Sequence, residues 1–292
     1  KYHYDKHKDL LKMVVTGSSA FYIDEKFKDY LAGRKRIFTL PTLSFSEFLQ
    51  FQNREELVPF VNSGSLPLVH KSEMDRKLNE YLIYGGYPDV VLESNLNEKQ
   101  AALKEIADSY VKKDALEASL KYPEIYMKLL TIIASQSGLF NSREVGNDLK
   151  IDRMTVEAYL RVMRKSFHVS TVKPFSRNLS KELRKMPKLY LNDLGLRNYF
   201  TNNFSAIASR DDRGDLLENY AFRLFLDHYP LEDIKFWRTQ KGQEVDFIIA
   251  ENNAYEIKYD KSGYDVSKYK YFKEKYPGIP LTPVYKNSIL EL

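Results

Sequence analysis

The sequence predicts a multidomain α/β protein, and three observations lead to that fold class. Short apolar runs alternate with helical patterns at the start, residues 71 to 135 are helical throughout, and strands return between residues 234 and 285. The length of 292 residues is enough for two or three domains, because a domain usually holds about 100–150 residues. The composition, 43% apolar and 29% charged, is that of a folded globular protein and excludes wholesale disorder.

The first part of the chain has the pattern of an α/β core. Leu10–Thr16 is an apolar run that ends in the polar turn after Gly17, which is typical of a buried strand. A second strand is expected at Arg36–Leu40, after a helix. Ser44 and Glu47 then have the spacing of a capping box at the start of a short helix.

The pattern between Lys71 and Ser135 is helical with one interruption. Gly85-Gly86-Tyr87-Pro88 breaks the first helix, because glycine and proline together stop helical structure. Longer amphipathic helices are expected from Glu98 to Leu116 and from Glu124 to Ala134, the second with apolar residues at helical spacing.

The middle of the chain has the order of elements of a winged helix, which is three helices followed by a two-stranded basic wing. Asn141 and Asp152 are expected to cap the second and third helices. Phe167 is expected on the inward face of the third helix. The wing strands are expected at Val169–Val172 and Lys188–Leu191.

The net charge of +5 is concentrated in one part of the sequence. Nine basic residues and one acidic residue lie between Arg161 and Lys188, so this window carries +8 and the rest of the chain −3. A concentrated basic surface favours contact with phosphate groups. The predicted nucleic-acid contacts are Arg161, Arg164, Lys165, Lys181, Arg184 and Lys185. The alternative is a winged helix that only packs against protein and has a solvated charged face.

Two acidic strands near the end of the chain carry the strongest chemical signal. Residues 244–249 and 255–258 are expected to form a hairpin, and a three-residue loop would set Asp246 opposite Lys258. Alternation places Asp246, Glu256 and Lys258 on one face. Two convergent carboxylates suit a hard divalent cation, so Asp246 and Glu256 are the predicted metal ligands. The alternative is a Glu–Lys pair on a solvated sheet face.

Asp246 and Glu256-Ile257-Lys258, preceded by a helical Glu218, resemble the core motif of PD-(D/E)XK nucleases. The resemblance implies that Glu218, Asp246, Glu256 and Lys258 are catalytic, with Mg²⁺ or Mn²⁺ at this site. In a working site, the two carboxylates would share one ion beside Lys258. In a structural remnant, Lys258 would bridge the carboxylates or Glu218 would turn to solvent. The residue types favour the working geometry.

A wider resemblance covers nearly the whole chain. The segments that carry it are Val15–Ser19, Leu31–Arg34, Leu43–Phe48, Tyr84–Pro88, Pro187–Arg197, Leu217–Tyr220, Trp237–Thr239 and Lys241–Phe247. Together they resemble prokaryotic AAA-type ATPases with a C-terminal domain of unknown function. The resemblance implies a partial AAA-type α/β core in residues 1–68 and a helical lid in 69–135. It also implies a winged helix in 136–200 and a restriction-endonuclease-like α/β domain in 201–292.

The same resemblance implies nucleotide chemistry near the start of the chain. Thr16 or Ser18 would touch the γ-phosphate or its water, and Arg34 would act as an arginine finger, with ATP and Mg²⁺ as cofactors of the intact parent. The alternatives are a polar turn and a surface arginine. The chain contains no Gly-x-x-x-x-Gly-Lys-Ser/Thr motif. We therefore expect a fragment whose phosphate-binding loop precedes Lys1, and which binds ATP weakly or not at all.

The predicted function is that of the C-terminal portion of a prokaryotic AAA-type ATPase that engages DNA, a protein partner or a second copy of itself. The alternatives are a metal-dependent nuclease and a non-catalytic binding module. The absence of cysteine excludes disulfides and thiolate sites, and five scattered histidines disfavour a zinc enzyme. No apolar run reaches the roughly 20 residues that cross a bilayer. We expect a cytoplasmic protein without a membrane partner.

Overall fold

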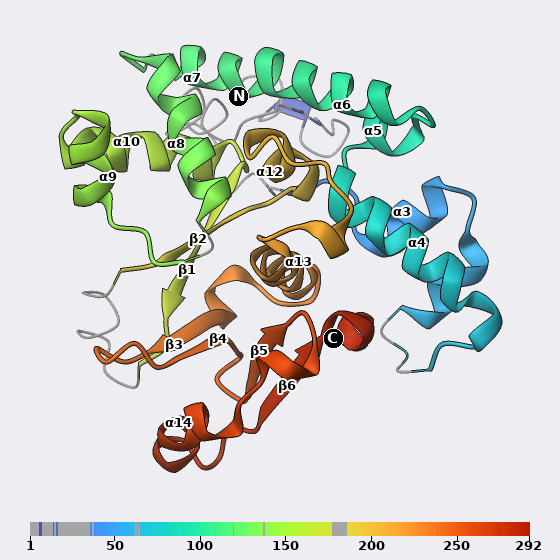
Figure 1. Cartoon of the computed structure of the whole chain (residues 1–292). Helices are drawn as coiled ribbons and strands as arrows, with labels where there is room; N and C mark the ends of the chain where they lie inside the picture. Colours follow the sequence, from blue (N-terminus) through green and yellow to red (C-terminus); the bar gives the residue numbers. More distant parts are fainter. Residues whose placement is uncertain are drawn as a thin grey trace.

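The computed structural model of the chain is shown in Figure 1. It describes residues 38–61, 65–118, 120–136, 138–176 and 186–292, and single residues at positions 6, 7, 14, 16, 36 and 63. Within these residues it contains helices and one six-stranded mixed sheet, so the α/β class is confirmed. No helix among them is long and apolar enough to span a membrane.

The first half of the described chain is helical. Its elements are α3 (Phe45–Phe51), a 3-10 helix (Glu55–Phe60), α4 (Leu68–Tyr84), α5 (Pro88–Leu92), α6 (Leu96–Glu105), a π-helix (Ile106–Val111), α7 (Lys112–Glu117) and α8 (Pro123–Ser135). The predicted capping box is confirmed: the Glu47 amide donates to the Ser44 hydroxyl, and the Ser44 amide donates to the Glu47 carboxylate. Residues 38–40, predicted to end a strand, have no regular structure. Phe38 and Leu40 are exposed there, without a described sheet neighbour to cover them.

The break after α4 is confirmed, and a close approach of two backbone segments explains it. Gly85 has φ +72°, a conformation that favours glycine. A Cβ at Gly85 would lie 2.4 Å from Asp193 Oδ1, and one at Gly195 would lie 2.1 Å from the Tyr84 carbonyl oxygen. The end of α4 therefore packs backbone against backbone on α12 (Leu194–Phe200).

The middle of the chain contains two helices and two strands in the region where the sequence predicts a winged helix, and the winged helix itself stays a prediction. They are α9 (Ser142–Leu149), α10 (Arg153–Lys165), β1 (Val169–Pro174) and β2 (Lys188–Leu191), and the two strands pair antiparallel. The caps at Asn141 and Asp152 are confirmed. The inward position of Phe167 is wrong. The helix ends at Lys165, and Phe167 has φ +59° and a side chain that is 40% exposed.

The last part of the chain alternates between helices and strands. It contains α13 (Arg213–His228), β3 (Ile234–Arg238), β4 (Glu244–Ile249), β5 (Asn253–Lys258), α14 (Lys270–Lys275) and β6 (Leu281–Tyr285). Short 3-10 helices span Ile207–Ser209, Leu231–Asp233, Lys261–Gly263, Val266–Tyr269 and Lys286–Glu291. The predicted strands at 169–172, 188–191, 234–238 and 281–285 are confirmed.

All six strands join in one sheet with the order β2-β1-β3-β4-β5-β6. β1 pairs parallel with β3 and β5 pairs parallel with β6, whereas the other neighbours are antiparallel. The sheet therefore crosses the boundary expected between residues 200 and 201. The four predicted domain ranges stay predictions.

Both faces of the sheet are covered. Figure 1 shows α13 in the centre of the molecule, between the strands β3 to β6 and the helices α4, α6 and α7. Phe225 of α13 packs against Phe247 of β4 and Tyr255 of β5, in the same core as α3 and α4. On the opposite face, α14 buries Phe272 against β3 and β4. The strands are consequently enclosed on two sides.

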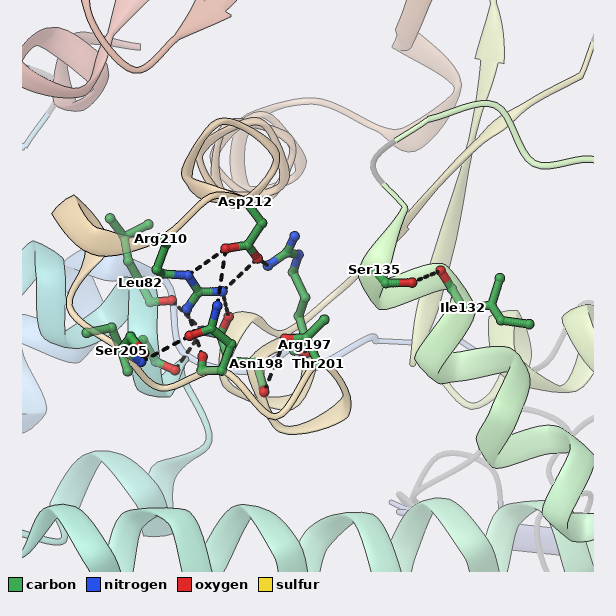
Figure 2. Close-up of polar contacts among 11 residues, drawn as sticks. Leu82, Ile132, Ser135, Arg197, Asn198, Thr201, Ser205, Arg210 and Asp212 are labelled. Atoms are coloured by element: carbon green, nitrogen blue, oxygen red, sulfur yellow. Dashed lines mark hydrogen bonds and ion pairs between the residues drawn. The ribbon is translucent and has the colours of Figure 1, made fainter.

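A buried polar network fastens the helical half to the sheet half (Figure 2). The Asn198 amide nitrogen donates to the carbonyl oxygen of Leu82 at 2.9 Å, at the end of α4. Its amide oxygen accepts from Arg210 at 2.8 Å. Asp212, just before α13, accepts from both Arg210 and Arg197. Asn198 and both arginines are buried, so each needs these partners.

Replacing Asp212 should make the free energy of unfolding depend less on pH in the acidic range. Burial raises the pKa of Asp212, but hydrogen bonds from Arg210 and Arg197 outweigh it and lower the pKa to about 2. An unfolded aspartate titrates near about 3.9, so this stabilisation is present above about pH 4 and is lost as pH falls towards 2. We expect Asp212→Asn to cost about 1–2 kcal/mol at pH 7, because partial solvent exposure weakens the ion pairs. The difference from wild type should shrink between pH 4 and pH 2.

Urea unfolding at a series of pH values measures this difference. Asp211→Asn is the matched control, because Asp211 is adjacent to Asp212, carries the same charge and is exposed to solvent. It should change the free energy of unfolding by less than about 0.5 kcal/mol. An Asp212→Asn deficit that stays constant down to pH 2 would contradict the assignment.

Candidate functional site

A buried lysine lies among the predicted acidic residues. The Lys188 ammonium nitrogen, on β2, lies 2.9 Å from Glu218 Oε1, 2.5 Å from Glu244 Oε1 and 3.7 Å from Asp246 Oδ1. Its side chain is 1% exposed. In the sequence, Lys188 belongs to the basic window near the predicted wing. The structure instead turns this residue inward, where it faces carboxylates from α13 and β4.

A second lysine lies on the other side of the same carboxylates. Lys258 Nζ is 2.5 Å from Glu256 Oε1 and 3.9 Å from Asp246 Oδ2. Asp246 Oδ2 also accepts from the Ile257 amide at 2.8 Å. We call Glu218, Glu244, Asp246 and Glu256 the carboxylate cluster. Asp246 lies at its centre, since it contacts both lysines.

The register of the hairpin differs from the prediction. Ile248 pairs with Ala254 and Phe247 with Tyr255, so the expected pairing of Asp246 with Lys258 is wrong. The turn explains the difference. Ala250 and Glu251 both adopt positive φ, at 48° and 58°, and the Asn252 amide donates to the Ile249 carbonyl at 3.0 Å. The chain therefore reverses earlier than a loop at residues 251–253 would allow.

A bulge in β4 helps to place the acidic side chains. Lys235 pairs with Ile248 but Trp237 pairs with Val245, so two residues of β4, Asp246 and Phe247, face one residue of β3. A bulge re-aims side chains next to it. The expected alternative of a solvated sheet face is wrong, because Asp246 and Glu256 are only 7% and 5% exposed.

The electrostatics of the cluster follow from burial and the two ammonium groups. Burial and the Glu218 charge raise the pKa of Asp246 well above its usual value, although Lys188 and Lys258 oppose this shift. Burial alone would lower the pKa of Lys188, but the surrounding carboxylates raise it well above its usual value. Lys188 therefore stays charged. Asp246 holds a proton more readily than an ordinary aspartate.

Glu218 and Glu244 have further partners. The Tyr190 hydroxyl, also on β2, donates to Glu218 Oε1 at 2.5 Å, and burial raises the pKa of Tyr190. Arg238 donates to Glu244 Oε2 at 2.7 Å. Burial raises the pKa of Glu244, but Lys188 and Arg238 outweigh it and the net shift is downward. The cluster is therefore satisfied by protein groups.

This arrangement does not fit a divalent cation. The ammonium groups of Lys188 and Lys258 contact the carboxylate oxygens that a metal ion would need as ligands. Among the residues that the structure describes, no group of three or more His, Cys, Asp or Glu side chains is placed to hold a metal ion. Lys258 lies between Glu256 and Asp246, which is the arrangement expected for a structural remnant. The catalytic roles of Glu218, Asp246, Glu256 and Lys258 stay predictions.

The predicted nucleic-acid and nucleotide residues are described only in part. Arg161 and Arg164 are exposed on α10, Lys165 is half-buried beside them, and Arg164 donates to the Thr171 hydroxyl at 3.2 Å. Thr16 is exposed. Five other predicted residues lie outside the described part of the chain: Ser18, Arg34, Lys181, Arg184 and Lys185.

Two residues that contact the cluster, Lys188 and Tyr190, were not predicted to do so. Lys188 and Tyr190 occupy alternate positions of β2, so they share a face and both contact Glu218. That alternation was a usable signal. Glu218, on the partner helix α13, is thirty residues from Lys188 in sequence. No local pattern indicates which face of β2 this helix covers.

Family profiles match three parts of this chain. Residues 1–49 match an AAA domain, residues 75–206 match a "Domain of unknown function (DUF8612)", and residues 213–288 match a "Domain of unknown function (DUF4143)". The start of the chain is thus similar to part of an AAA-type α/β core, and its end is similar to a domain of unknown function. The resemblance to AAA-type proteins is confirmed to that extent. The PD-(D/E)XK resemblance stays a prediction.

Individual relatives match most of the chain. An uncharacterized protein of Methanocaldococcus jannaschii is 26% identical over 254 residues, which are 82% of this chain and 53% of that protein. One of Haemophilus influenzae is 28% identical over 262 residues, which are 87% of this chain and 59% of that protein. The chain therefore spans a little over half the length of these relatives. An uncharacterized protein of Mycobacterium tuberculosis is 25% identical over 165 residues. No solved structure matches the chain.

Removing the Glu218 carboxylate should destabilise the protein strongly. Glu218→Ala leaves the buried Lys188 ammonium and the Tyr190 hydroxyl without one of their partners. Breaking a buried ion pair in this way costs about 3–5 kcal/mol. Denaturant unfolding of the variant at neutral pH measures the loss.

Glu73→Ala on α4 is the matched control, since Glu73 forms ion pairs with Arg54 and Arg76 but is one-third exposed. Exposed pairs contribute about 0–1 kcal/mol, so this variant should lose much less stability. Equal losses in the two variants would show that the cluster does not depend on Glu218.

Proposed function

We propose that this chain is part of an ATP-hydrolysing protein that transmits the state of its bound nucleotide to DNA. The proposal of ATP hydrolysis rests on the match of residues 1–49 to an AAA domain. The predicted nucleotide contacts Thr16, Ser18 and Arg34 all fall within this match. In the whole protein, ATP and Mg²⁺ are the proposed cofactors.

The proposed DNA contact is the exposed side of α10 with the adjoining wing. The inward side of α10 is fixed, because Val156, Leu160 and Met163 are buried. This packing holds Arg161 and Arg164 outward on a rigid support. Guanidinium groups suit phosphate oxygens, because they present several donors in a fixed plane. Lys181, Arg184 and Lys185 follow in the basic window of the sequence and are further proposed phosphate contacts.

The proposed coupling uses contacts between the helical half and the sheet half. Asn198 joins α4 to α12, and the backbone of α12 meets the end of α4 at Gly195. β1 and β2 follow the DNA-contacting helix and belong to the same sheet as the C-terminal strands. A displacement of the helical half would therefore reach the sheet through direct packing.

Metal-dependent cleavage is not part of this proposal. The PD-(D/E)XK resemblance raises it, but two lysines contact the carboxylates that a metal would need. The alternative ligand of the basic surface is a protein partner or a second copy of the chain. The DNA-binding experiment below distinguishes this alternative from DNA.

Replacing Arg34 should slow ATP hydrolysis in the full-length protein that contains this chain. An arginine finger stabilises charge in the transition state, and its loss typically costs about 10³-fold or more in kcat. Arg34→Ala should show a loss of that order in a steady-state phosphate-release assay. Arg36→Ala, an exposed arginine two positions away, is the control and should hydrolyse ATP at the wild-type rate. Wild-type turnover in Arg34→Ala would exclude the finger role.

The DNA contact is tested by the double variant Arg161→Ala/Arg164→Ala. Wild type should bind duplex DNA with an affinity that falls steeply with salt, and the slope of log affinity against log salt should decrease by about 0.9 for each lost phosphate contact. The affinity should fall for every sequence alike. Fluorescence anisotropy over a salt series measures both quantities.

The matched control is Lys71→Ala/Lys104→Ala, which removes two exposed charges from α4 and α6. It should keep the wild-type slope. If wild type binds no DNA even at low salt, the basic surface is a protein-contacting surface instead. A control that lowers affinity as much as the test variant would mean that binding reflects net charge alone.

A further inference from the structure

The carboxylate cluster brings four acidic side chains together inside the protein. They come from α13, β4 and β5, and all four are at least three-quarters buried. Buried carboxylates repel one another unless a cation lies between them. In this structure the cations are two ammonium groups and, at Glu244, the Arg238 guanidinium group. Lys188 contacts the Glu218, Glu244 and Asp246 side, and Lys258 contacts the Glu256 side.

The two lysines differ in how firmly they are held. Lys258 is 29% exposed and can leave the cluster without opening the core. Lys188 is 1% exposed, its ammonium group lies 5.5 Å from the centre of the Phe236 ring, and its backbone pairs with Val172 and Leu139. It cannot turn away unless β2 separates from the sheet.

We propose that the Lys188 ammonium group is a built-in cation that replaces a divalent metal ion in the carboxylate cluster. The C-terminal region would then be a metal-independent module. This inference is independent of the proposed ATP hydrolysis and DNA contact.

Size and coordination support this assignment. An ammonium group is a compact point charge with three donors, and three carboxylates lie within 3.7 Å of it. Magnesium requires oxygen ligands at about 2.0–2.1 Å in octahedral geometry. The oxygens of Glu218 and Glu244 lie 2.9 Å and 2.5 Å from the lysine nitrogen, so a metal ion and this ammonium group cannot occupy the same place. The ammonium group also already offsets part of the negative charge that would attract a metal ion.

The variant Lys188→Met tests the proposal, because it removes the charge and keeps a similar length of apolar side chain. Its carboxylates should repel one another, so its melting temperature should fall. Adding MnCl₂ should then restore much of the loss, and one Mn²⁺ per chain should bind about tenfold or more tighter than to wild type. Differential scanning calorimetry and titration calorimetry measure the two effects.

Lys99→Met is the matched control. Lys99 is also 1% exposed, but it donates to the Val90 carbonyl at 2.6 Å and meets one carboxylate, Glu80, at 3.4 Å. This variant should lose stability without recovery in MnCl₂. A third variant, Lys188→Met/Asp246→Asn, should lose the Mn²⁺ binding that Lys188→Met gains.

Three results would overturn the proposal. The first is Mn²⁺ binding by wild type that Asp246→Asn abolishes, and the second is equal Mn²⁺ affinity in Lys188→Met and Lys99→Met. The third applies if Lys188→Met does not fold even in MnCl₂. In that case Lys188→Met/Glu218→Gln, which removes one carboxylate with the lysine, should recover folding. Its failure to fold would mean that Lys188 does not act through charge balance.

Discussion

The ammonium group of Lys188 allows four acidic side chains to share the interior of this protein. It joins β2 to α13 and to β4 through contacts with Glu218, Glu244 and Asp246. A lone buried carboxylate is costly, and several together are more so, unless opposite charges lie within contact distance. The packing of α13 on the sheet therefore depends on this balance as well as on its apolar side chains. Tyr190 strengthens the same contact from the next inward position of β2.

The helical half depends on a different kind of contact. Its apolar residues form two cores, one shared with α13 and the sheet and one around α8 and α10. Between them the Gly85 and Gly195 backbones pass close to α12 and α4, and Asn198 satisfies two carbonyl groups that the end of α4 leaves open. Side-chain size and hydrogen bonding thus fix the same junction. A substitution with a larger residue at either glycine would separate the two helices.

Local rules predicted several of the described elements after residue 43 of this chain. Ser44, Asn141 and Asp152 cap helices because their side chains satisfy free amides, and this requirement is visible within four residues of sequence. The β4–β5 register was not predictable in the same way. It depends on two non-glycine residues, Ala250 and Glu251, in a conformation that their type does not favour.

The sequence indicated several residues of the candidate site but not how they are arranged in space. Asp246, Glu256 and Lys258 lie close together in sequence, and strand alternation was enough to group them. Lys188 belongs to a window of basic residues, and its charge suggested a surface position. Only the contact between β2 and α13, which are far apart in sequence, turns it inward.

The parallel pairing of β1 with β3 is short, with Lys173 opposite Lys235 and Pro174 opposite Phe236, whereas β5 and β6 pair over five positions. This pairing joins fewer residues than any other in the described sheet, so few backbone hydrogen bonds must break to open it. The ion pairs of Lys188 run from β2, on one side of this pairing, to β4 and α13 on the other. Under a pulling force, β1 and β3 would therefore separate first. The ion pairs of Lys188, more than backbone hydrogen bonds, would resist this separation.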